Sequence, residues 1–67
     1  MTPEEILKEI QADVDTIERA HRRINGLVED LHATGDDGFH YGASKIGDGA
    51  DYIATGLFDM QDGITRS

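Results

Sequence analysis

The stretch FHYGASKIGDGADYIATGLFDMQDGI, residues 39–64, decides the fold class. Its apolar side chains recur at alternating intervals of four and three residues, which is the period of one face of a helix. They are Phe39, Ala43, Ile46, Ala50, Ile53, Leu57, Met60 and Ile64. The pattern predicts an amphipathic helix over about residues 39–64, with its apolar face packed against another helix.

The preceding segment has the same alternation and predicts a first helix over about residues 3–32. Thr2 suits the capping position, Pro3 the first helical position, and Glu5 completes a capping box. His21 falls on the apolar stripe of this helix. We expect it to be a hydrogen-bonded residue of the seam between the helices, because no second histidine lies at the helical spacing that a metal site would need.

Residues 33–38 separate the two helices. Gly35 supplies flexible backbone, while Asp36 and Asp37 supply turn and capping side chains. Two helices joined by so short a loop lie antiparallel. The chain, residues 1–67, is therefore predicted to be one all-α domain, an antiparallel two-helix hairpin. Because it is short and has no cysteine, we expect copies to associate into a homo-oligomeric helical bundle.

A glycine stripe runs along the second helix, with Gly42, Gly49, Gly56 and Gly63 spaced seven residues apart. Glycine inside a helix costs about 1 kcal/mol relative to alanine, so the stripe costs roughly 3–5 kcal/mol. We expect the close approach of another helix to compensate, whether it comes from a copy of this chain or from a different protein. The residues predicted for this interface are Gly42, Gly49, Gly56, Ala50, Ile53 and Leu57.

The formal net charge of −8 opposes general attraction to DNA, RNA or anionic membranes. No apolar run approaches the roughly 20 residues that span a bilayer, and the amino terminus does not have the pattern of a signal peptide. We expect a cytoplasmic location, in the host if the gene belongs to a phage. Histidines and carboxylates form no catalytic or metal-binding spacing, so we expect a non-enzymatic protein without metal or cofactor.

Two groups of residues are suited to an anionic ligand. A helix amino terminus offers free backbone amides, and an aromatic ring beside a hydroxyl and an amine suits a nucleotide. A basic cluster in the first helix adds positive charge. The predicted ligand contacts are Tyr41, Ser44, Lys45, Arg22 and Arg23. The alternative is that these are ordinary capping and solvated surface residues.

Gly42, Ser44, Ile46, Gly49 and Ile53 resemble the pattern Gly, Ser or Thr, aliphatic, Gly, aliphatic. This pattern occurs in the second helix of small phage anti-CBASS sponges, which sequester cyclic oligonucleotides. The resemblance covers the second helix only. It implies an oligomeric helical protein of phage anti-defence that traps a small anionic, cyclic nucleotide at subunit junctions without cleaving it.

Two other functions remain open. Asp48, Asp51, Asp59 and Asp62 are suited to an acidic inhibitor that occupies a basic nucleic-acid-binding surface of a host defence protein. Phe58, followed four residues later by Asp62, resembles a feature of the small helical-hairpin partners of type VII secretion. Both alternatives keep the prediction of a binding protein.

Overall fold

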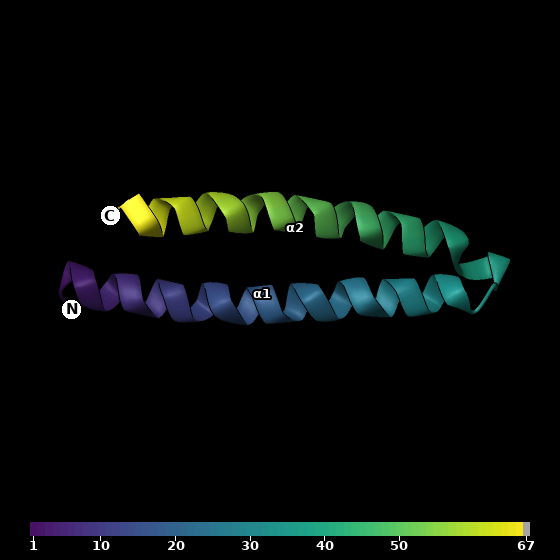
Figure 1. Cartoon of the computed structure of the whole chain (residues 1–67), viewed down its shortest axis with the longest axis horizontal. Coiled ribbons are helices and arrows are strands. Elements are labelled where there is room, and N and C mark those ends of the chain that lie inside the picture. Colours follow the sequence, from purple (N-terminus) through teal and green to yellow (C-terminus); the bar gives the residue numbers. More distant parts are fainter. Residues whose placement is uncertain (67) are drawn as a thin grey trace.

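The structure, a computed structural model, describes residues 1–66, and for Asp37 the backbone alone. Its elements are α1 (Pro3–Ala33), a short 3-10 turn η1 (Asp37–Phe39) and α2 (His40–Arg66). The two helices lie side by side and antiparallel, so the start of α1 and the end of α2 lie at the same end of the rod (Figure 1). The rod measures 51 × 15 × 14 Å. Because residues 1–66 contain two long helices and no strand, the predicted helical hairpin is confirmed.

The first helix begins where its sequence signals lie. The Thr2 hydroxyl oxygen accepts a hydrogen bond from the Glu5 backbone N–H at 3.2 Å. The same hydroxyl lies 3.2 Å from Oε1 of Glu5, to which it donates. Pro3 occupies the first helical position, where its missing N–H leaves no intrahelical bond unmade. The predicted Thr2 cap is thus confirmed. In addition, the Glu5 carboxylate accepts a hydrogen bond from the Thr2 hydroxyl.

Local hydrogen bonds make the turn. Gly35 has a φ of +69°, a left-handed conformation that glycine adopts without the steric penalty of a side chain. The Thr34 hydroxyl donates to the Leu31 carbonyl at 2.7 Å, which satisfies one of the free carbonyls at the end of α1. The Asp36 carboxylate then accepts from the Gly38 N–H at 2.9 Å. Gly35 and Asp36 therefore act as turn residues, as predicted.

The helix bounds differ slightly from the sequence prediction. The first helix extends to Ala33, and the second continues to Arg66. Phe39 belongs to the 3-10 turn, where its N–H donates to the Asp36 carbonyl at 3.1 Å, so α2 begins at His40. The predicted capping role of the Asp37 side chain lies outside the described part of the chain.

The seam between the helices is thin. Its fully buried side chains are Val14, Ala43, Ala50 and Leu57. Between them, the half-buried His21 donates from Nε2 to the Ala50 carbonyl oxygen at 2.8 Å, which confirms the predicted hydrogen-bonded histidine. A small residue at position 50 leaves the backbone of α2 open to this donor. The hairpin is thus held by one narrow strip of contacts, and most of its other surface is exposed.

Candidate functional site

One long side of the hairpin is apolar along its whole length. Residues seven apart return to nearly the same side of a helix, so each helix contributes one row. We term this side the apolar flank; it consists of Ile10, Ile17, Ile24, Leu31, Phe39, Ile46, Ile53 and Met60. Ile24 and Ile46 line one shallow hollow, which places both rows on the same side. Although apolar, Ile46 is 49% exposed and Phe39 56%, while Ile24 and Leu31 are half-buried, so the described part of the chain covers this flank only in part.

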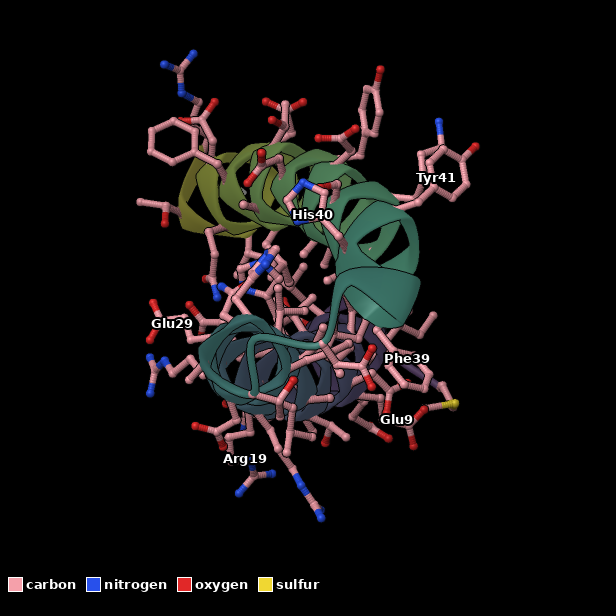
Figure 2. The ribbon with its side chains drawn as sticks, turned by 90° about the vertical axis from the view of Figure 1, so that its right-hand side faces the viewer. Glu9, Arg19, Glu29, Phe39, His40 and Tyr41 are labelled. Atoms are coloured by element: carbon pink, nitrogen blue, oxygen red, sulfur yellow. The ribbon has the colours of Figure 1, made fainter. Side chains whose placement is uncertain are left out.

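The opposite side of the hairpin is polar. There the His32 and His40 rings meet edge to face with their centroids 5.8 Å apart. Glu18 and Gln61 line a hollow on the same side. In the end-on view of Figure 2, Phe39 lies to the right of the helices and Glu29 to the left. The hairpin therefore has one side suited to water and one suited to another apolar surface.

The glycine stripe borders the apolar flank on α2. A Cβ atom placed on any of its four glycines would meet no other heavy atom within 4 Å. The first helix is therefore not the close neighbour that the stripe was predicted to have. Ala50 and Leu57, predicted for the subunit interface, are buried by α1 and belong to the seam of the single chain. Ile53 and the glycine stripe remain open to a second molecule.

The predicted ligand contacts at the start of α2 lie among carboxylates. Tyr41 is 75% exposed and points away from both helices (Figure 2). Ser44 shares a shallow hollow with Asp48 and Asp51, and Lys45 shares another with the same two aspartates. Negative charges so close to Ser44 and Lys45 oppose the binding of a phosphate there.

The arginines predicted as ligand contacts lie elsewhere. Arg22 lines a hollow on the polar side together with His21 and Phe58. Ser44 shares its hollow with Glu29, which lies seven residues from Arg22, so the two hollows are about 10 Å apart along the rod. A single chain therefore does not bring the five predicted ligand residues into one site.

Sequence reasoning missed that Arg22 and the Phe58 ring line the same hollow. The two residues lie far apart in sequence and come to one hollow only through the antiparallel register of the helices. The one available signal was His21, because a seam histidine fixes which part of α2 faces Arg22. Phe58 is 77% exposed.

Within residues 1–66, one ion pair is formed, between Asp62 and Arg66 at 3.1 Å, and both side chains are exposed. No described group of histidines and carboxylates is arranged to hold a metal ion. Over the same residues, neither helix combines the length and apolar character needed to cross a membrane. No protein family, curated protein or solved structure matches this chain.

Proposed function

We propose that this chain is a non-enzymatic binding protein that works as a homo-oligomer, with the apolar flank as the contact between copies. The exposed apolar flank carries this proposal. Contiguous apolar surfaces of this length on soluble proteins mark sites of association. A helix that packs against neighbours on two sides needs a wider apolar stripe than a helix with one neighbour, and the apolar flank widens the stripe in this way.

The exposed area of the single chain supports the same proposal. Its accessible surface is 5287 Å². A compact monomer of 7.3 kDa exposes about 4,200 Å², so this hairpin exposes roughly 1,100 Å² more. A specific dimer of standard size buries about 800 Å² on each partner. Covering the apolar flank with a second copy would therefore bring the exposed area close to that of an ordinary folded protein.

Native mass spectrometry and light scattering of the purified chain test the association. We expect a discrete oligomer at tens of micromolar protein. Ile46→Asp should convert it to a monomer, because a carboxylate would be buried without a partner. Thr55→Asp, which also adds one carboxylate but on the exposed outer side of α2, should leave the oligomer intact. A wild-type chain that is monomeric at this concentration would rule out the proposal.

The outer face of α2 supports a basic protein surface as the ligand of the assembled protein. This face carries the exposed rings of Tyr41 and Phe58 together with Asp48, Asp51 and Asp62. Aromatic side chains are enriched where proteins bind one another, and clustered carboxylates steer a basic partner toward them. The face lies away from the apolar flank, so association of copies leaves it free.

Titration with a lysine-rich peptide tests this face. We expect Asp48→Asn/Asp51→Asn/Asp62→Asn to weaken binding more than a control that neutralises three exposed carboxylates of α1 outside the apolar flank, at Glu4, Glu5 and Asp15. Binding should also weaken as salt is added. Equal losses in the two triple variants would mean that only net charge matters, and this ligand class would then be rejected.

Sequestration of a small anionic nucleotide is the second candidate, in line with the resemblance to the anti-CBASS sponges. The hollow beside Arg22 supports it, because a guanidinium and the Phe58 ring together suit a phosphate and a base. Cyclic di- and trinucleotides at concentrations well above a micromolar dissociation constant should then raise the melting temperature. The rise should disappear in Arg22→Gln and persist in Arg19→Gln. If no nucleotide raises it, this candidate fails.

A further inference from the structure

Two rows of polar side chains border the apolar flank, one along each helix. The row on α1 is Glu9, Thr16, Arg23 and Asp30. The row on α2, beyond the glycine stripe, is Lys45, Tyr52, Asp59 and Arg66. Figure 2 shows Glu9 on the same side of the hairpin as Phe39. Within one chain the two rows lie on opposite outer edges of the flank, because each is turned away from the other helix.

The hairpin also sets the height of each residue along the rod. The His21–Ala50 hydrogen bond puts these two positions level, so Lys45 lies about 6 Å farther from the loop than Asp30. Because each side chain leans toward the amino terminus of its own helix, the Asp30 and Lys45 side chains lean toward one another and reach nearly the same height. The remaining members follow at seven-residue steps in opposite directions along the antiparallel helices. The members of the two rows thus pair by height as Asp30 with Lys45, Arg23 with Tyr52, Thr16 with Asp59, and Glu9 with Arg66.

We propose that a second copy of this chain packs on the apolar flank about a two-fold axis parallel to the helices, with both loops at the same end. The proposal rests on the self-association proposed above and names its geometry. Such an axis preserves height and places α1 of one copy beside α2 of the other. Residues at equal heights in the two rows then become neighbours across the interface.

The neighbours are complementary in charge. Asp30 meets Lys45 of the second copy, and Glu9 meets Arg66 of the second copy, which also pairs with its own Asp62. Arg23 meets the ring of Tyr52 of the second copy, a pairing that favours a cation–π contact. Each contact occurs twice because a two-fold interface is self-complementary. All charged members of both rows except Asp59, which meets Thr16, thus find an attractive partner.

The sizes of the side chains fit as well. In the seam, the bulky His21 of α1 packs against the small Ala50 of α2, and Val28 and His32 line a hollow with the small Ala43. The proposed axis repeats this arrangement between copies. The row of α1 that consists of Ile6, Asp13, Ala20 and Leu27 then faces the glycine stripe of the second copy, where its larger members, Ile6 and Leu27, meet open space. Small residues on two sides of α2 are thus explained by two neighbouring first helices.

The other way to join two apolar flanks uses an axis perpendicular to the helices, with the loops at opposite ends. Each helix then lies antiparallel to its own copy. At full overlap, Glu9 meets Asp30 of the second copy, and Lys45 meets Arg66 of the second copy. Like charges placed opposite one another are destabilising. The charge pattern therefore selects the parallel axis.

Thiol cross-linking with a bifunctional reagent shorter than about 10 Å tests the geometry, and the natural chain has no cysteine to interfere. In Thr16→Cys/Asp59→Cys, position 16 of each copy lies near position 59 of the other in the proposed dimer, so we expect a covalent dimer on a denaturing gel. Thr16→Cys/Arg23→Cys is the matched control, and it links copies only if the axis is perpendicular. Neither variant can close within one chain, because its two positions lie on opposite edges or about 10 Å apart on one helix.

Covalent linkage in Thr16→Cys/Asp59→Cys, together with its absence in Thr16→Cys/Arg23→Cys, supports the proposal. Linkage of the second variant, or of neither, overturns it. Native mass spectrometry of the unmodified chain separates this failure from a failure of the proposed function, because a dimer of different geometry would still be seen there. A monomer would remove both proposals.

Charge exchange gives an independent readout. Asp30→Lys should weaken the dimer about tenfold, because two attractive contacts become repulsive. The double exchange Asp30→Lys/Lys45→Asp should restore the affinity, and Asp48→Lys on the outer face should change it by less than about twofold. If the axis were perpendicular, Asp30→Lys would instead tighten the dimer by facing Glu9, and the proposal would fall.

Discussion

At the scale of single residues, His21 links the two helices by a hydrogen bond from its ring to the backbone of Ala50. The Ala50 carbonyl already accepts the N–H of its own helix, so the imidazole adds a second bond to it. The bond matters because the seam contains so few fully buried side chains. His21 also sets the register, since it can reach only a backbone carbonyl that small side chains leave open.

We expect His21→Ala to lower the free energy of unfolding by about 1–2 kcal/mol, because it removes both the hydrogen bond and the packing of the ring. His21→Leu should cost less than about 1 kcal/mol, since it refills the space and leaves no buried donor without a partner. Urea unfolding at one fixed protein concentration measures both. Equal costs for the two variants would show that the hydrogen bond, not the packing, dominates.

The Thr2 cap leads to a second prediction at this scale. Thr2→Ala should destabilise the protein by about 1 kcal/mol, because the Glu5 N–H loses its acceptor. Thr55→Ala is the control, as an exposed threonine in mid-helix whose replacement by alanine should be neutral or stabilising. Thermal unfolding followed by circular dichroism compares them. If Thr2→Ala is as stable as the wild type, the cap contributes nothing.

At the scale of the element, α2 carries glycines that α1 does not contact. In an isolated hairpin, alanine at these positions would meet only open space and would favour the helix by about 1 kcal/mol each. In the proposed assembly, a methyl group there would hold the second copy away. The two situations therefore predict changes of opposite sign for the same substitution.

Gly49→Ala/Gly56→Ala should weaken association by at least tenfold and lower the melting temperature at micromolar protein. Gly26→Ala is the matched control, because Gly26 lies on the exposed outer side of α1 and also has open space around its Cβ position. It should raise stability and leave the oligomer unchanged. Analytical ultracentrifugation reads out the association. A double variant that melts higher with the same subunit number would contradict the close approach of a second copy at the glycine stripe.

At the scale of the whole molecule, folding and association are expected to be coupled. The seam alone buries little, and the apolar flank adds to stability only when it is covered. Each copy also carries a net charge of −8, so association has to overcome mutual repulsion. The apolar flank and the paired edge rows are the parts of the surface that offset this repulsion.

The melting temperature should therefore rise with protein concentration. A hundredfold increase adds about 2.7 kcal/mol to the stabilisation of an associating chain by mass action. The Ile46→Asp variant should have a lower melting temperature that does not change with protein concentration, because it does not associate. Scanning calorimetry over a hundredfold range measures this dependence. A wild-type melting temperature that does not change with concentration would mean that the hairpin is stable on its own.

The sequence by itself determined both helices, the turn between them and the hydrogen-bonded place of His21. These features follow from interactions within a few residues, such as the Thr2 cap, the positive φ of Gly35 and the four-three apolar period. Only the tertiary structure decided which apolar row is buried by the chain itself and which stays open. A helical period identifies an apolar face but not the neighbour that covers it. Ala50 and Leu57, predicted for the subunit interface, are buried within the single chain, and the hollow shared by Arg22 and Phe58 was not predicted.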